Sequence, residues 1–126
     1  MKNEKWKKEN LIAKLSVNFS LRIIKLKKFL TEQRKETVMS KQILRSGTSI
    51  GANIYESEHA QSTADFISKL YIALKEANET KYWLILLCKS EYITEKQYDS
   101  IVNELQIIIG TLVNIIKRTK DNHYVE

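Results

Sequence analysis

Glu56 and His59 form a Glu-x-x-His motif, the i, i+3 pair that carboxylate-bridged di-iron helical bundles use as metal ligands. Such a site needs two of these pairs and two further carboxylates that face the same interior. The second histidine, His123, has Lys120 three residues before it, so the second pair is missing. The sequence therefore predicts no metal site.

Cys88 and the pair Glu76 and Glu79 are the other candidates for catalysis. Cys88 stands in an apolar stretch, where a cysteine usually behaves as a small, inert core residue. The two glutamates project about 60° apart on a helix, and no long loop is predicted that would hold a substrate. We therefore expect a protein that is not an enzyme and that needs no cofactor. Glu76 is expected either to join Asn53 in a polar network between helices or to be exposed to solvent.

Gly47 and Gly51 lie four residues apart within a predicted helix, where each glycine costs roughly 1 kcal/mol relative to alanine. The pair shares one face, so the backbone of a neighbouring helix can approach closely there. A phosphate-binding loop is the alternative, but the Gly-Lys-Ser/Thr ending is absent and no strand precedes the glycines. We therefore assign Gly47 and Gly51 to helix packing.

Basic residues are concentrated in the first third of the chain. Residues 1–45 hold thirteen Lys or Arg against four Glu, whereas residues 46–126 hold eight basic against eleven acidic residues. This asymmetry is typical of a surface that contacts a polyanion such as RNA or DNA, and a solvated lysine-rich surface is the alternative. No zinc finger or RNP pattern predicts base reading, so phosphate contacts are expected. The candidate nucleic-acid-binding residues are Lys14, Arg22, Lys25, Lys28, Arg34, Lys35, Lys41 and Arg45, with the Lys2–Lys8 segment as the alternative.

Helices must position these residues, because the chain has no proline and only three glycines. A β-rich domain would need many more turn residues. Apolar residues at steps of three and four predict an all-α, up-down-up-down antiparallel four-helix bundle that forms a single domain over 1–126. The predicted helices cover about 9–30, 36–59, 63–88 and 95–118, and the predicted flexible ends are 1–8 and 119–126.

The starts of the last two helices carry capping signals. Ser62 with Asp65 and Thr94 with Gln97 each place a hydroxyl three residues before a side chain that accepts hydrogen bonds.

Three features absent from the sequence limit the class of protein. No unbroken apolar run approaches the roughly 20 residues of a membrane span, no secretory signal is recognisable, and one cysteine cannot form an intramolecular disulfide. We therefore expect a cytoplasmic protein without a membrane partner.

Two apolar rows exceed what the core of one bundle needs. One row lies opposite the core stripe of the first predicted helix. The other lies on the last predicted helix, rotated by about 100° around the helix axis from its core stripe. Together they would form a larger apolar patch than soluble monomers normally expose, which predicts a homo-oligomer. A bundle with rotated helices that buries one row is the alternative. The candidate interface residues are Val17, Leu21, Ile24, Val102, Ile109, Val113 and Ile116.

The middle of the chain resembles the signature of the 23S rRNA intervening-sequence protein family, also called S23. The resemblance is dense over about residues 38–90 and is carried by the segments 45–56, 60–62, 65–70 and 73–84. Two departures are Tyr55, where the family more often has a small residue, and the missing proline in the first loop. The resemblance implies a bacterial, cytoplasmic homopentamer of four-helix bundles without known catalysis. It also implies a likeness in fold to the accessory proteins of diversity-generating retroelements, which bind nucleic acid and a reverse transcriptase through a basic surface.

Two functions are consistent with this sequence. The first is a non-catalytic oligomer that binds RNA, for example rRNA, or DNA through its basic half. The second is an interaction scaffold that recruits a protein partner, in which the basic residues serve solubility. Because phosphate contacts weaken steeply with salt, the salt dependence of nucleic-acid binding distinguishes the two functions.

Overall fold

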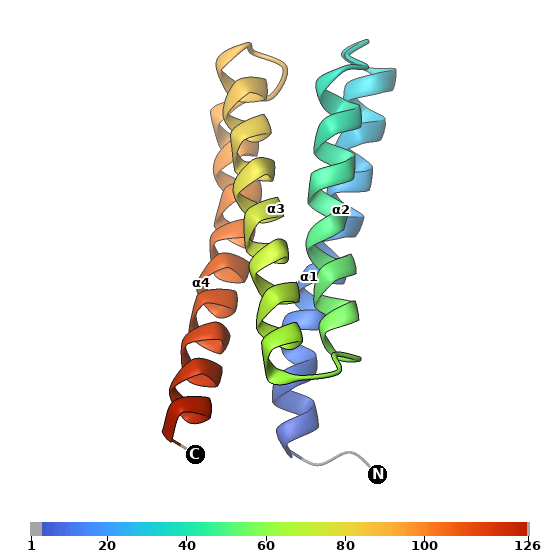
Figure 1. Cartoon of the computed structure of the whole chain (residues 1–126). Helices are drawn as coiled ribbons and strands as arrows, with labels where there is room; N and C mark the ends of the chain where they lie inside the picture. The colour runs from blue at the N-terminus through green and yellow to red at the C-terminus, as the bar shows by residue number, and fades with distance from the viewer. Residues whose placement is uncertain (1–3, 126) are drawn as a thin grey trace.

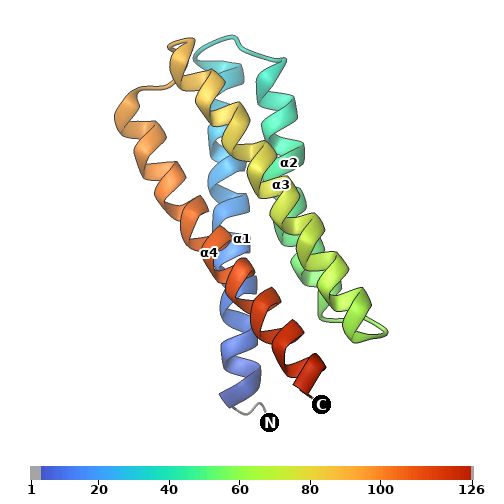
Figure 2. The ribbon, with the colours of Figure 1, turned by 60° about the vertical axis from the view of Figure 1, so that its left-hand side comes forward.

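The structure is a bundle of helices connected in series. The computed structural model describes the backbone of residues 4–125 and the side chains of residues 11–122. Figures 1 and 2 show successive helices running in opposite directions. The predicted all-helical, four-helix architecture is therefore confirmed. The helices are α1 (Glu4–Glu32), α2 (Met39–Ser57), α3 (Thr63–Lys89) and α4 (Glu95–Val125).

Each helix packs against its two neighbours around the bundle. The contacts join α1 to α2, α2 to α3, α3 to α4 and α4 to α1, so α1 and α3 occupy opposite corners. The contact between α2 and α3 is the largest of the four, and the contact between α1 and α4 is the smallest. The loops 33–38 and 90–94 lie at one end of the bundle, and the loop 58–62 lies at the other (Figure 1).

The ends of three helices, α1, α2 and α4, differ from the sequence expectation by two residues or more. Both α1 and α4 are longer than predicted, and the segment 119–125, expected to be flexible, continues α4. Residues 4–8, also expected to be flexible, form the first part of α1. Conversely, α2 is shorter than the predicted helix at both ends. The remaining predicted flexible residues lie outside the described part of the chain.

The late start of α2 has a local cause in Glu36, whose side chain is buried. Its carboxylate accepts hydrogen bonds from the backbone N–H groups of Val38, Met39 and Ser40 at 3.1, 2.9 and 2.7 Å. These groups belong to the first turn of a helix, where no backbone carbonyl is available to them. Lys35, with φ at 57°, turns the chain so that Glu36 precedes the helix instead of forming part of it.

The capping signals of α3 and α4 are present as hydrogen bonds. The Asp65 N–H donates to Ser62 Oγ at 3.0 Å, while the Asp65 carboxylate accepts from the Gln61 N–H. At α4 the exchange is reciprocal, because the Gln97 N–H donates to Thr94 Oγ1 and the Thr94 N–H donates to Gln97 Oε1. Both predicted capping sites are confirmed.

One apolar stripe of each helix forms the core. Steps of three and four residues keep a side chain on the same face of a helix, so these positions converge on the bundle axis. The fully buried large side chains are Phe19, Ile23, Leu30, Ile43, Ile50, Ile54, Leu70, Leu84, Leu87, Leu105, Ile108 and Leu112.

The buried stripe of α4 ends at Ile116, which is only 4% exposed, whereas the adjacent Ile115 is half-buried. A step of four residues from Leu112 turns the stripe toward α3. There Ile116 lines a groove together with Tyr71 and Leu74 of α3. The prediction that Ile116 belongs to an exposed row is therefore wrong.

Gly47 and Gly51 lie on the side of α2 that packs against α1. A Cβ atom at Gly47 would lie 2.9 Å from Cγ2 of the fully buried Ile23, closer than real Cβ atoms approach. At Gly51 the nearest atom would be Ser16 Oγ at 3.3 Å, which is tight but less severe. Gly110 of α4 has no heavy atom within 4 Å of its Cβ position. Close approach of α1 and α2 therefore requires glycine at residue 47.

One helix of the described residues is long and apolar enough to cross a membrane by length and composition alone. It is α4, over Glu95–Asn122. A core helix of a soluble protein meets the same criteria, so a single such helix is weak evidence of a span. Five of its residues, from Ile101 to Ile116, are buried in the bundle.

Candidate nucleic-acid interface

The outer side of α1 is a basic surface formed mainly by lysines. Lys14, Lys25 and Lys28 are exposed, and none of them has a hydrogen-bond or ion-pair partner among the described side chains. No acidic residue occurs in the sequence between Glu9 and Glu32. The positive charge of this surface is therefore not neutralised locally.

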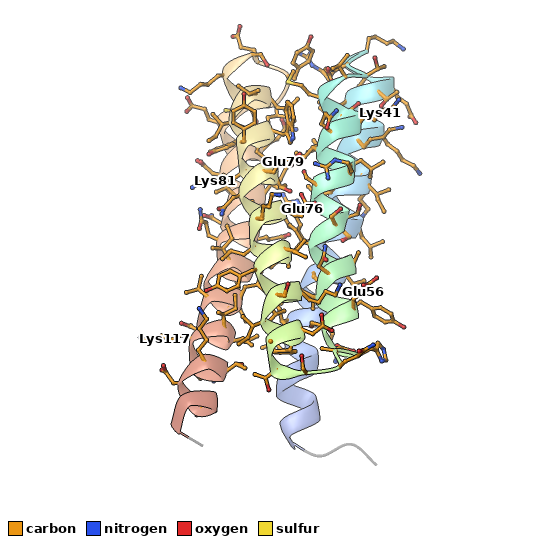
Figure 3. The ribbon with its side chains drawn as sticks, viewed as in Figure 1. Lys41, Glu56, Glu76, Glu79, Lys81 and Lys117 are labelled. Carbon is orange, nitrogen blue, oxygen red and sulfur yellow. The ribbon has the colours of Figure 1, made fainter. Side chains whose placement is uncertain are left out.

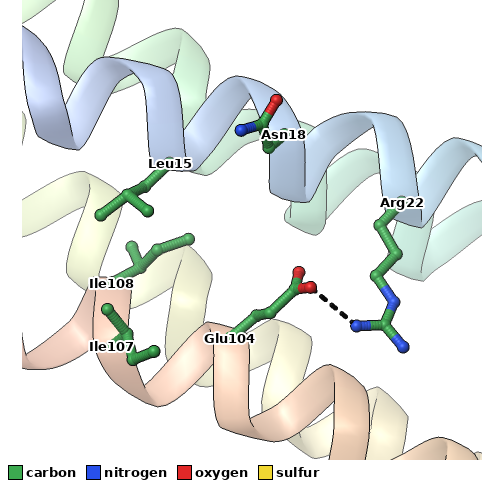
Figure 4. Close-up of a pocket in the computed structure, with 6 residues that line it drawn as sticks. All are labelled: Leu15, Asn18, Arg22, Glu104, Ile107 and Ile108. Carbon is green, nitrogen blue, oxygen red and sulfur yellow. Dashed lines mark hydrogen bonds and ion pairs between the residues drawn. The ribbon is translucent and has the colours of Figure 1, made fainter.

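Arg22 belongs to the same helix but points into the groove between α1 and α4 (Figure 4). Its Nη1 lies 2.8 Å from Glu104 Oε1, and its Nη2 donates to Ser100 Oγ at 2.7 Å. The guanidinium charge is thus paired within the protein. The groove has a cavity volume of about 220 Å³ and is lined by Leu15, Asn18, Arg22, Glu104, Ile107 and Ile108.

Arg34 connects the two loops at one end of the bundle. Its Nη2 donates to the backbone carbonyl of Glu91 at 2.9 Å, and its guanidinium lies 5.8 Å from the centre of the Tyr92 ring. Arg34 therefore has a structural role there. Lys35 in the loop 33–38 and Lys41 at the start of α2 are exposed. Neither has an ion-pair partner in the described part of the chain.

Arg45 spans the contact between α2 and α3, where it pairs with Glu76 and Glu79. The Trp83 indole N–H also donates to Glu79, at 3.0 Å. Both glutamates lie between the two helices in Figure 3. The Trp83 hydrogen bond and then Arg45 hold the pKa of Glu79 below its usual range. The Glu79 carboxylate, in turn, raises the pKa of Arg45.

A polar network does join α2 and α3, but its members differ from those expected. Asn53 donates to the Ser49 carbonyl of its own helix and does not contact Glu76. The buried Thr80 hydroxyl instead donates to Ser46 Oγ at 3.0 Å. The expected Asn53–Glu76 contact is therefore wrong, and Arg45 takes the place of Asn53.

The structure thus divides the predicted basic residues by type. All five lysines project into solvent, whereas the three arginines are bound within the protein. Sequence reasoning missed this division because the partners of Arg22 and Arg45 lie 31–82 residues away in the chain. The side chains of the Lys2–Lys8 segment and of His123 lie outside the described residues.

The two predicted apolar rows differ in exposure. The row on α1 is solvent-accessible, with Val17 57%, Leu21 53% and Ile24 39% exposed. On α4 only Val113 is exposed, because Val102 and Ile109 pack partly against the core. The neighbouring Ile107, which sequence reasoning missed, is 57% exposed. The main unpartnered apolar row of the predicted set is therefore on α1.

The residues considered for metal or nucleophilic chemistry have other partners. Glu56 lies 3.7 Å from Lys69, and the His59 ring packs edge-on against Tyr55. Cys88 packs against the hydrophobic core. In the part of the chain that the structure describes, no three His, Cys, Asp or Glu side chains come together around a common point.

The comparisons with known proteins agree on one family. Residues 8–114 match the 23S rRNA-intervening sequence protein family. A crystal structure of a protein of unknown function from the S23 ribosomal protein family of Bacteroides thetaiotaomicron is 62% identical in sequence. The match covers 87% of this chain and 98% of that one, with a TM-score of 0.86. No curated protein matches the chain.

Proposed function

The chain belongs to the 23S rRNA-intervening sequence protein family, and from that premise we propose that it is a non-catalytic oligomer that binds nucleic acid. The binding surface is the outer side of α1, extended by the loop that follows it. The ligand is RNA, for example rRNA, or DNA, and binding takes place in the cytoplasm. The proposed contact residues are Lys14, Lys25, Lys28, Lys35 and Lys41.

The observation that carries this proposal is the unneutralised charge of α1. From Leu11 to Thr31 the helix has five basic residues and no acidic one, and among the described side chains only Arg22 of the five is paired. Exposed lysines without carboxylate partners can release counterions from a phosphate backbone on contact. Lysine is a point charge without the planar fork of arginine, so the surface is suited to phosphates and not to bidentate reading of bases.

Self-association is part of the proposal, and the family resemblance suggests a pentamer. Exposed apolar side chains on two helices support it. Val17, Leu21 and Ile24 form a row on α1, whereas Ile107 and Val113 are exposed on different sides of α4, toward α1 and toward α3 respectively. Single exposed apolar residues are ordinary in soluble proteins, but rows of them mark interaction surfaces.

The alternative function is a scaffold that binds a protein partner without nucleic acid. The same exposed apolar side chains support it, since protein interfaces bury such residues. The two functions differ in their dependence on salt. Phosphate contacts weaken as counterions compete, whereas apolar contacts do not.

Fluorescence anisotropy with a labelled RNA and a labelled DNA, measured over a range of salt concentrations, tests the proposal. We expect both ligands to bind, with the logarithm of the affinity falling linearly as the logarithm of the salt concentration rises. Light scattering on the same samples gives the number of subunits. Absence of binding at about 50 mM salt would contradict nucleic-acid binding and favour the scaffold.

A further inference from the structure

The outer side of α1 combines charge with an apolar row in a defined order. Val17, Leu21 and Ile24 occupy the middle, Lys14 precedes them, and Lys25 and Lys28 follow them. At 100° per residue these six side chains project from one side of the helix, opposite the buried stripe. The apolar part spans about 10 Å, and the lysines at its ends are about 16–21 Å apart along the axis.

This order does not fit a dry contact between the α1 rows of two copies of the chain. A second α1 laid over Val17, Leu21 and Ile24 would also cover the lysines that flank them. Burial of an unpaired ammonium group is strongly unfavourable, and α1 offers no carboxylate in this segment to pair with it. A partner on this surface must therefore bring its own negative charges to both ends of the apolar row.

Nucleic-acid duplexes supply the charges but not the apolar surface. A double helix presents phosphates and sugars outward and keeps the faces of its bases stacked inside. A single strand carries phosphates at the same time as unstacked bases, whose flat faces are apolar and pack on protein side chains regardless of sequence. Such a strand has complementary chemistry for both the lysines and the row between them.

We propose that the outer side of α1 binds single-stranded RNA or DNA in preference to a duplex. This inference rests on the proposed nucleic-acid binding. Lys14 at one end and Lys25 with Lys28 at the other contact phosphates, and the bases between them pack on Val17, Leu21 and Ile24. The α1 row is then not the subunit contact, and self-association uses the exposed Val113 side of α4 and leaves α1 accessible.

The test compares an unstructured oligonucleotide with the duplex of the same length, at one salt concentration, in wild type and two variants. Val17→Ser and Leu21→Ser each remove apolar surface from the row and leave every lysine in place. Ile72→Ser is the matched control, because Ile72 is 39% exposed on α3, outside the proposed binding surface. Light scattering on each sample reports the oligomeric state.

We expect the single strand to bind at least about ten-fold more tightly than the duplex. Val17→Ser and Leu21→Ser should each weaken single-strand binding by about three- to ten-fold, in line with the apolar area they remove, without changing its salt dependence. The control should bind as wild type does.

Four results would overturn the inference or the function on which it rests. Equal affinity for duplex and single strand, or unchanged binding in both α1 variants, would leave phosphate binding intact and remove the role of the apolar row. Dissociation of the oligomer by Leu21→Ser would assign the row to a second copy of the chain. Absence of binding to either ligand in wild type would instead refute the proposed function itself.

Discussion

The contact between α2 and α3 and the contact between α1 and α4 are built in opposite ways. Between α2 and α3, Arg45 pairs with two glutamates, Trp83 donates to one of them, and buried hydroxyls join Ser46 to Thr80. Between α1 and α4, Arg22 binds Glu104 and Ser100 beside an open groove, and apolar side chains remain exposed on both helices.

This difference separates structural residues from functional ones. The segments 45–56 and 73–84, which carry the family resemblance, are those that form the α2–α3 contact. Gly47 and Gly51 in these segments are explained by packing against α1, and Arg45, Glu76 and Glu79 by ion pairs within the protein. The lysines available for a ligand lie mainly on α1, outside these two segments.

Substitution at Gly47 should destabilise the bundle most, because α1 and α2 approach closely there. The same helix, α2, also forms the contact with α3. Gly47→Leu should lower the free energy of unfolding by about 3 kcal/mol, because the side chain must displace the buried Ile23. Gly110→Ala, at an exposed position of α4, is the control. It should raise stability by up to about 1 kcal/mol, since alanine favours a helix and meets no neighbour there. Urea unfolding measures both, and a stabilising Gly47→Ala would contradict the packing role.

A smaller effect is expected at the start of α2. Glu36→Ala removes a carboxylate that accepts three backbone N–H groups, so the free energy of unfolding should fall by about 1–2 kcal/mol. Glu32→Ala, at an exposed glutamate in the last turn of α1, should change it by less than about 0.5 kcal/mol. Equal urea midpoints for the two variants would show that Glu36 does not cap α2.

The ion pairs of Arg45 with Glu76 and Glu79 should contribute least to stability, and their contribution depends on pH. Because the pKa of Glu79 is lowered in the folded protein, its contribution is complete above the ordinary value of 4.5 and is lost as the pH falls through the folded value. Both partners are partly exposed, so the contribution is less than about 1 kcal/mol. Melting temperatures between about pH 6 and pH 3 should fall less steeply for Glu79→Gln than for wild type. Glu58→Gln serves as the exposed control, and parallel curves for all three proteins would contradict the assignment.

The sequence predicts most of the fold because its signals are local. Helical periodicity gives the core stripes, and Ser62 and Thr94 mark helix starts by residues only three positions away. Glu36 was misplaced inside a helix because its capping role depends on the left-handed conformation of Lys35, which no local pattern indicates. Ile116 was misplaced because the direction of the last turns of α4 depends on where α3 lies.

The candidate site was predicted only in part, for a related reason. Residue type and charge balance point to the basic half of the chain, and the lysines of α1 are exposed as a basic surface requires. Whether an arginine is available depends on carboxylates far away in sequence, such as Glu104 for Arg22. Ion pairs between distant elements are set by the packing of whole helices, so charge counting overestimates the surface open to a ligand.

Phosphate binding by the lysines of α1 is tested by the salt dependence of single-strand affinity in Lys25→Glu/Lys28→Glu. We expect weaker binding and a slope of log affinity against log salt that is shallower by about 1.4, because two phosphate contacts are lost. Lys75→Glu/Lys117→Glu changes the net charge equally on α3 and α4 and should keep the wild-type slope. Equal affinities and slopes for the two double variants, both folded and equally assembled, would contradict the account.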